Sequence, residues 1–221
     1  EGAAPARRAF AAIAAAIHAS DPVTVTVSSA QGRESAQALL PAGIRILDIP
    51  SDDCWMRDIG PTFLTGPGGT VRAVDWRFNA WGGEANGLYA PWDRDDAMAA
   101  RIAEVEGVER YRAPFVLEGG AIHVDGEGTV FTTAECLLSE GRNPQMTRGE
   151  IEQGLKDWLG ATAVVWLPRG VYLDHTDGHV DNLLHVCAPG TVALTWTNDR
   201  GDPQYERSAE ALEHLASCRD A

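Results

Sequence analysis

The densest group of chemically useful side chains lies at residues 174–182, where the sequence reads Asp-His-Thr-Asp-Gly-His-Val-Asp-Asn. If this stretch is extended, the two-residue period of a strand places His175, Asp177, His179 and Asp181 on one side. Two chemistries fit such a face: binding of a divalent metal, or acid–base catalysis in which a carboxylate holds a cation and a histidine moves protons. A polar loop that satisfies only its own backbone is the alternative without chemistry.

Two other segments combine a carboxylate with a feature that can contact a ligand. Trp55 and Asp58 lie three residues apart, so an aromatic face and a carboxylate could both contact one cation. Glu118 precedes Gly119 and Gly120, which would let a ligand come close to the backbone. For each segment an ordinary structural role, as a core tryptophan or a surface turn, explains the same residues.

The elements that must position these residues alternate between helices and short strands, which is typical of an α/β domain. Helices are predicted at residues 5–19, 35–40, 94–106, 147–159 and 204–217. Strands are predicted at residues 23–28, 44–49, 71–76, 120–124, 130–133, 164–167, 182–186 and 192–195. Thr147 and Glu150 form a capping-box pattern. Phe10, Ile13 and Ile17 share one helical face, which favours a helix packed on a sheet over a signal peptide.

The three acidic segments have similar positions relative to a weak internal repeat. Gly-Thr-Val begins at Gly69, Gly128 and Gly190, which are 59 and 62 residues apart. Asp58, Glu118 and Asp181 lie 11, 10 and 9 residues before these glycines. Repeated units at a fixed period predict a stacked or radial array, in which equivalent acids converge on the axis. The alternative is that Gly-Thr-Val is merely a common start of a hairpin strand.

Composition limits the classes of partner. The 221 residues are 44% hydrophobic and 23% charged, which indicates a globular chain and excludes a disordered or membrane-spanning one. The formal charge of −14 repels nucleic acids and anionic membranes, so the expected partner is a small cation. The four cysteines are widely spaced without a Cys-x-x-Cys pair, so we expect reduced thiols, a cytoplasmic protein and no metal.

Four motifs together resemble the agmatine deiminase branch of the bacterial peptidyl-arginine deiminase family. They are Trp-Met-Arg-Asp-x-Gly-Pro-Thr at 55–62, Phe-Asn-Ala-Trp-Gly-Gly at 78–83, Leu-Glu-Gly-Gly at 117–120 and Asp-Gly-His-Val-Asp-Asn at 177–182. The resemblance covers nearly the whole chain. It implies the pentein fold, an α/β propeller of repeated ββαβ units, incomplete in this chain. It also implies one catalytic-type domain over residues 1–221, without the family's N-terminal start and C-terminal unit.

The resemblance further implies roles for individual residues. Asp58 and Asp181 would hold a guanidinium group, and His179 would be the general acid–base. Glu118 would be a further acid at the substrate. The planar, permanently charged guanidinium suits two carboxylates that bind its edges.

Trp55 and Asn182 would complete the substrate site. The implied reaction is hydrolysis of agmatine to N-carbamoylputrescine and ammonia through a cysteine thiouronium intermediate, with no cofactor. The family's nucleophile has an Asn-x-His-Cys context that Cys54, Cys187 and Cys218 lack, so it is expected outside this chain. These three cysteines are expected to be small buried hydrophobes.

Other functions stay open at this point. A peptidyl-arginine deiminase would share the guanidinium chemistry, and a binding protein without catalysis would need only the acids. A metallohydrolase would use His175, Asp177, His179 and Asp181 as ligands. Association into a homo-oligomer is also an open expectation.

Overall fold

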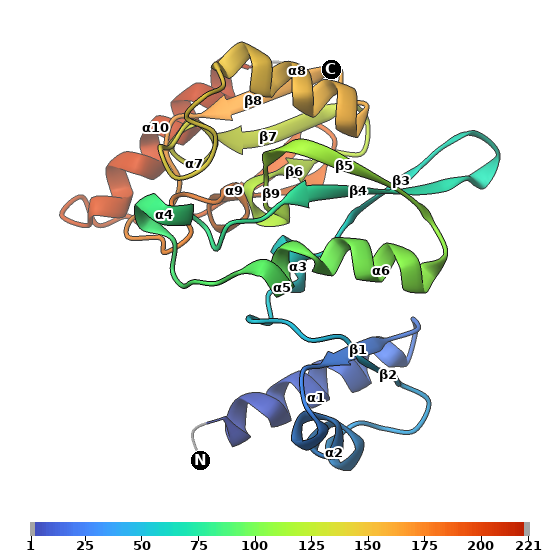
Figure 1. Cartoon of the computed structure of the whole chain (residues 1–221). Coiled ribbons are helices and arrows are strands. Elements are labelled where there is room, and N and C mark those ends of the chain that lie inside the picture. The colour runs from blue at the N-terminus through green and yellow to red at the C-terminus, as the bar shows by residue number, and fades with distance from the viewer. Residues whose placement is uncertain (1–2, 219–221) are drawn as a thin grey trace. The chain divides into compact units, whose positions relative to one another are not determined.

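The computed structural model describes residues 3–218 and divides the chain into two compact units, residues 1–54 and 55–221 (Figure 1). In the first unit the elements are α1 (Ala4–His18), β1 (Thr24–Val27), α2 (Ala30–Leu39) and β2 (Arg45–Asp48). Strands β1 and β2 pair in parallel, with Thr24 opposite Arg45. Ser29 caps α2 by accepting a hydrogen bond from the Gly32 amide, so this helix begins earlier than the predicted residue 35.

The predicted apolar face of α1 is not buried. Phe10 and Ile13 are each 55% exposed and Ile17 is 48% exposed, whereas Ala14 is buried. The expectation that Phe10, Ile13 and Ile17 pack on a sheet is therefore wrong. The helix contacts α2, and Ala14 is its buried residue.

The second unit contains three β-hairpins, and two of them continue through a helix into a parallel third strand (Figure 1). The first sheet contains β3 (Thr62–Thr65), β4 (Val71–Arg77) and β5 (Glu109–Val116), with α6 (Met98–Glu106) between β4 and β5. The second contains β6 (His123–Val124), β7 (Thr129–Thr133) and β8 (Ala163–Leu167), with α8 (Arg148–Leu159) before β8. The third contains β9 (Leu184–Ala188) and β10 (Thr191–Leu194), followed by α10 (Pro203–Ser217).

The Gly-Thr-Val repeat corresponds to these hairpins. Gly69, Gly128 and Gly190 each precede the second strand of a hairpin and have φ values of 76°, 117° and 69°. This left-handed backbone favours glycine, which explains why the same residue recurs at the turn. The repeat therefore marks structurally equivalent ββα units.

Each hairpin also follows a single helical turn. These turns are α3 (Met56–Ile59), η2 (Gly119–Ala121) and α9 (Val180–Leu183). Both α3 and α9 pack against η2, although 62 residues separate Asp58 from Gly120 in the sequence. The three turns bring together the ends of three units and form the framework of the candidate site.

Short helices fill the remaining connections. They are η1 (Pro67–Gly69), α4 (Gly83–Asn86), α5 (Asp93–Asp96) and α7 (Ala134–Leu137). The main core joins the first two sheets to α8 and contains Trp76, Phe115, Trp166 and Leu155. The Thr147–Glu150 capping box is present at the start of α8. Within residues 3–218 no helix is long and apolar enough to cross a membrane.

Candidate active site

Four predicted site residues meet where the three helical turns converge. Asp58 lies in α3, Glu118 immediately precedes η2, and His179 and Asp181 lie at the start of α9. His179 Nε2 is 3.8 Å from Glu118 Oε2, and His179 Nδ1 is 4.0 Å from Asp181 Oδ1. Asp58 Oδ1 accepts a hydrogen bond of 2.8 Å from the Gly120 amide. The convergence of acids predicted from the repeat is confirmed.

Gly120 makes this convergence sterically feasible. A Cβ atom built on Gly120 would lie 2.3 Å from His179 Nδ1 and 2.9 Å from carboxylate oxygens of both Asp58 and Asp181. The space that a side chain would fill is therefore occupied by Asp58, His179 and Asp181. We expected this glycine to let a ligand come close to the backbone, and the structure shows that it lets three side chains do so.

The predicted extended face at residues 174–182 is wrong. The backbone turns at Asp177 and Gly178, which have φ values of 59° and 91°, and α9 begins at Val180. Asp174 organises this loop by accepting hydrogen bonds from the amides of Thr176 and His179. The hydrogen bonds of Asp174 to the backbone therefore stabilise a loop in place of the strand that the two-residue period predicted.

The four candidate metal ligands of this stretch are consequently separated. His179 and Asp181 belong to the cluster, whereas His175 is exposed. Asp177 faces Asn86 and Arg142. This arrangement does not support a metal site formed by His175, Asp177, His179 and Asp181 together.

Arg142 connects the segments that surround the cluster, and sequence reasoning missed it. Its side chain is fully buried, and its Nε lies 2.7 Å from Glu118 Oε1. Its terminal nitrogens donate to the backbone oxygens of Trp81 and Thr176. Its partners are distant in sequence, so no local pattern could identify it. A planar guanidinium with several fixed donors suits this bridging position.

Trp81 is the second residue that sequence reasoning left without a role. Its indole Nε1 donates a hydrogen bond of 3.0 Å to Asp58 Oδ2, and the side chain is buried. Ala80 and Trp81 both have positive φ values, 55° and 61°. Such backbone is unfavourable for residues with a Cβ atom, and strain of this kind concentrates at functional sites. Asp58 therefore receives two fixed donors, one from the backbone and one from Trp81.

Two effects shift the pKa values in the cluster: burial away from water and the charges of neighbouring side chains. Burial raises the pKa of Asp58, and its hydrogen bonds and His179 offset this only in part. For Glu118, burial opposes ionisation, but Arg142 and His179 together hold its pKa below the usual value. For His179, burial opposes the charged form, but Glu118, Asp58 and Asp181 raise its pKa. Burial therefore disfavours the charged form of each group, whereas the opposite charges in the cluster favour the charged forms of Glu118 and His179.

Trp55 and Asn182 lie at the edge of this arrangement. Trp55 directly precedes α3 and is 57% exposed. Asn182 is exposed and its Nδ2 donates to Asp174 Oδ2 at 3.2 Å. Their roles as substrate contacts stay predictions.

The cysteines occupy different surroundings from those expected. Cys54 and Cys187 are exposed and Cys218 is half-buried, so the expectation of three buried small hydrophobes is wrong. Cys136 is fully buried in α7, beside Glu118 and His179. Burial and the nearby Glu118 raise the pKa of the Cys136 thiol well above its usual value, which disfavours the nucleophilic thiolate.

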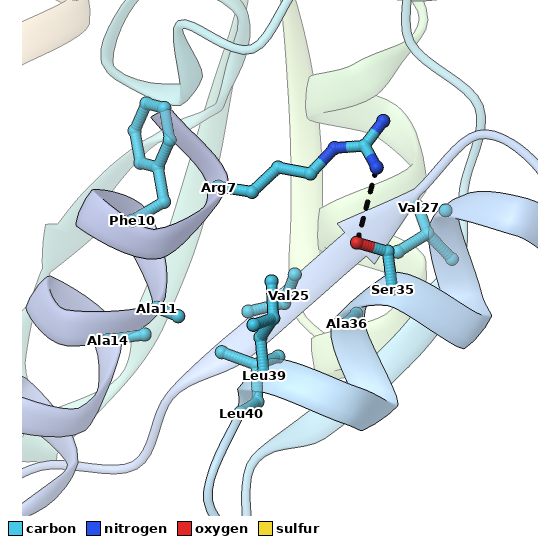
Figure 2. Close-up of a pocket in the computed structure, with 11 residues that line it drawn as sticks. Arg7, Phe10, Ala11, Ala14, Val25, Val27, Ser35, Ala36, Leu39 and Leu40 are labelled. Atoms are coloured by element: carbon cyan, nitrogen blue, oxygen red, sulfur yellow. Dashed lines mark hydrogen bonds between the residues drawn. The ribbon is translucent and has the colours of Figure 1, made fainter. Parts of the chain in front are cut away.

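A separate pocket lies within the first unit, between α1, β1 and α2. Its volume is about 210 Å³ and its walls are mainly alanine, valine and leucine side chains. Figure 2 shows Arg7 at its rim, where the guanidinium donates to Ser35 Oγ at 3.4 Å. The pocket has no carboxylate, imidazole or thiol, so it lacks the groups for acid–base or nucleophilic chemistry.

Comparison with known proteins identifies relatives over the whole chain. The family model for Porphyromonas-type peptidyl-arginine deiminase matches residues 1–221. An agmatine deiminase of Pseudomonas aeruginosa is 54% identical over 222 residues, covering 100% of this chain and 60% of the relative. A solved agmatine deiminase of Enterococcus faecalis, described as catalysing its reaction, matches with a TM-score of 0.95 and 46% identity, covering 100% of this chain and 60% of that one.

A third relative is solved with its ligand. It is a cysteine-to-serine variant of C. jejuni agmatine deiminase with substrate bound, which matches with a TM-score of 0.86 and 25% identity. The match covers 96% of this chain and 62% of that one.

The repeated units around a common acidic centre define a pentein-type α/β propeller, as predicted. The chain belongs to the Porphyromonas-type peptidyl-arginine deiminase family. It spans about 60% of the length of the relatives it matches, so the propeller is incomplete in this chain.

Proposed function

We propose that the protein to which this chain belongs hydrolyses the guanidino group of agmatine, giving N-carbamoylputrescine and ammonia. The observation that carries the proposal is the cluster of Asp58, Glu118 and Asp181 around His179, in which Glu118 and His179 are buried. The close similarity to agmatine deiminases supports it. The alkylated guanidinium of agmatine brings about five N–H donors and one positive charge to a site that offers carboxylate acceptors.

In this proposal Asp58 and Asp181 bind the edges of the guanidinium, and Glu118 accepts from the remaining N–H group. Arg142 keeps Glu118 ionised. Held in this way, the planar guanidinium presents its central carbon to a nucleophile. The substrate is therefore a small cationic guanidine, and the finer choice of agmatine rests on its relatives.

The nucleophile is proposed to be a cysteine outside these 221 residues. The neutral imidazole of His179 takes the proton of the cysteine thiol, and the thiolate adds to the guanidinium carbon. His179 then gives that proton to the leaving nitrogen, and ammonia departs. Water then attacks the thiouronium carbon, which releases N-carbamoylputrescine and regenerates the thiol. The substrate-bound cysteine-to-serine variant of the C. jejuni relative supports a cysteine in this role. Cys136 does not suit it, because its thiol pKa is raised.

Product analysis tests this function. The complete protein is incubated with equal concentrations of agmatine, free arginine and an arginine-containing peptide, and all ureido products are measured. We expect N-carbamoylputrescine and ammonia, with little citrulline. Comparable citrulline from free arginine would contradict the agmatine assignment, and dominant peptidyl citrulline would favour the peptidyl-arginine deiminase alternative.

A further inference from the structure

Cys136 gives the candidate site a feature that deiminase chemistry does not require. The thiol of Cys136, a carboxylate oxygen of Glu118 and a ring nitrogen of His179 all lie within 4.8 Å of one another. All three residues are buried. Sulfur, nitrogen and oxygen donors at this spacing match the ligand types of zinc sites with three protein ligands and one open position.

Unpartnered polar atoms provide an independent indication of a ligand. Glu118 Oε2 and His179 Nε2 are buried and make no hydrogen bond to the described residues. They lie 3.8 Å apart, too far for a hydrogen bond to each other. The ion pair of 3.8 Å leaves both buried atoms without a hydrogen bond, which is costly and which a group bound between them would relieve.

We propose that Glu118, Cys136 and His179 bind a thiophilic divalent transition metal ion, with Zn²⁺ as the representative ion. The metal takes one donor atom from each residue, and water or another small ligand fills the fourth position. Only modest shifts are needed to bring donors within 4.8 Å of one another onto one ion.

The charges around the site favour a cation despite Arg142. Arg142 lies 2.7 Å from Glu118 Oε1 and opposes the metal, but Glu118 can bind the guanidinium with one oxygen and the metal with the other. The charged groups that act on Cys136 and His179 from neighbouring elements are Asp58, Glu118, Arg142, Asp174, Asp177 and Asp181. Five of these six are acidic, so the local field attracts a divalent cation.

Binding must release protons. The metal binds the thiolate of Cys136 and the neutral imidazole of His179, so any proton on either group passes to solvent.

The metal and a guanidinium cannot occupy the site together. Both would use Glu118 and His179, and both are cations. This consequence rests on the proposed function, whereas the metal site itself does not. The metal would act as a competitive inhibitor of guanidine binding.

Cobalt spectroscopy tests the site in the 221-residue protein. Cys54, Cys187 and Cys218 are first replaced by serine, which leaves Cys136 as the single thiol. Addition of Co²⁺ should then give a thiolate-to-cobalt charge-transfer band and the intense d–d bands of four-coordinate geometry, and Zn²⁺ should displace it with one equivalent. Absence of the charge-transfer band in this folded variant would overturn the proposal.

Two further variants and one competitor complete the test. Cys136→Ser in the same background should abolish the charge-transfer band and weaken Zn²⁺ binding at least about a hundredfold, as measured by calorimetry. Glu118→Gln should weaken Zn²⁺ binding while it retains the band, which keeps the test valid if Cys136→Ser does not fold. Unchanged Zn²⁺ affinity in both variants would contradict the site. If Zn²⁺ binds as expected but agmatine does not compete, the metal site stands and the proposed function loses support.

Discussion

Asp58 and Asp181 are given the same proposed task in different surroundings. Asp58 is held by the Gly120 amide and the Trp81 indole, and burial raises its pKa. Asp181 lies at the more open side of the cluster, with a side chain 28% exposed. Asp58 is therefore a preorganised acceptor, whereas Asp181 can adjust as a ligand enters.

Replacement of one carboxylate by its amide tests this pair. Asp181→Asn preserves side-chain volume but turns N–H donors toward a guanidinium that has only donors. Charged hydrogen bonds contribute roughly 1.5–3 kcal/mol each, so kcat/KM of the complete enzyme for agmatine should fall at least about a hundredfold. Thermal stability should hardly change, because Asp181 is half-buried in a group of like charges.

Asp157→Asn is the matched control for this substitution. Asp157 is an exposed residue of α8 that accepts a hydrogen bond from Gln153, far from the cluster in the fold. It should leave kcat/KM unchanged. If Asp181→Asn unfolds the protein while the folded fraction keeps full activity, Asp181 is structural and does not bind guanidinium.

His179 makes guanidine binding depend on pH. Its pKa is raised because its proton is stabilised by Glu118, Asp58 and Asp181. A bound guanidinium neutralises the same carboxylates and repels the imidazolium, so binding expels the proton. Agmatine affinity should rise with pH up to about tenfold per unit below the pKa of His179, then level off.

Calorimetry with agmatine between about pH 6 and about pH 9 measures this dependence, since the unperturbed histidine pKa lies near 6.5. His179→Gln removes the titrating proton and should flatten the profile. If agmatine affinity rises as the pH falls, the guanidinium binds while His179 stays protonated, and binding does not expel the proton.

At the scale of elements, α9 can pack closely against η2 because Gly120 has no side chain. Gly120→Ala would place a Cβ 2.3 Å from His179 Nδ1 and 2.9 Å from Asp58 and Asp181 oxygens. We expect agmatine affinity to fall at least about tenfold and stability to fall by about 1–3 kcal/mol, the usual cost of overpacking. Binding calorimetry and denaturant unfolding measure the two effects.

Gly149→Ala is the control, because it adds the same methyl group at a position where that group contacts no other residue. Gly149 lies in α8, and a Cβ atom there meets nothing within 4 Å. Alanine favours helix over glycine by up to about 1 kcal/mol, so this variant should be slightly more stable and should bind normally. Equal effects of the two substitutions would show that the contacts of Gly120 do not matter.

Arg142 links η2, the Trp81 loop and the loop before α9. Arg142→Met would leave the buried Glu118 carboxylate without its ion-pair partner, which typically costs about 3–5 kcal/mol. Arg142→Lys keeps the charge but cannot reach all the carbonyls, so its loss of stability should be smaller. Unfolding by urea measures both variants. Arg72→Met, which breaks an exposed pair with Glu109, should change little, and an equal loss there would contradict the role of Arg142.

Elements with local signals were predictable from sequence. The capping residues Thr147 and Glu150 placed the start of α8 to within one residue. Strand β5 was missed because its sequence, Glu-Arg-Tyr-Arg-Ala-Pro-Phe-Val, contains charges and a proline in place of an apolar alternation. Its Arg110 and Arg112 pair with the buried Asp75, a tertiary interaction that no local pattern shows.

For the site, the repeat predicted which acids converge, because equivalent positions in equivalent units meet at one axis. Arg142, Trp81 and Cys136 were not predictable as members of the site. Each reaches the cluster through partners far away in sequence. Position in the repeat therefore identified the acids from sequence. The residues that hold these acids in place could be identified only from the three-dimensional structure.

At the scale of the whole molecule, the chain combines a net charge of −14 with a centre built from three units. The overall field attracts a cationic ligand, and the converging turns supply the acceptors that select a guanidinium. Binding groups therefore come from the described units, whereas the proposed nucleophile does not. Binding and turnover should be separable in this protein.

The 221-residue chain should accordingly bind agmatine without hydrolysing it. Cys136 is the cysteine that lies beside Glu118 and His179, and burial raises the pKa of its thiol, whereas Cys54 and Cys187 are exposed and Cys218 lies near the end of α10. Calorimetry should detect agmatine binding while an ammonia assay detects no product, and replacement of all four cysteines by serine should leave the absence of turnover unchanged. Ammonia release that disappears in the Cys136→Ser variant alone would instead identify Cys136 as the nucleophile, and the proposal that the attacking thiol lies outside this chain would be wrong.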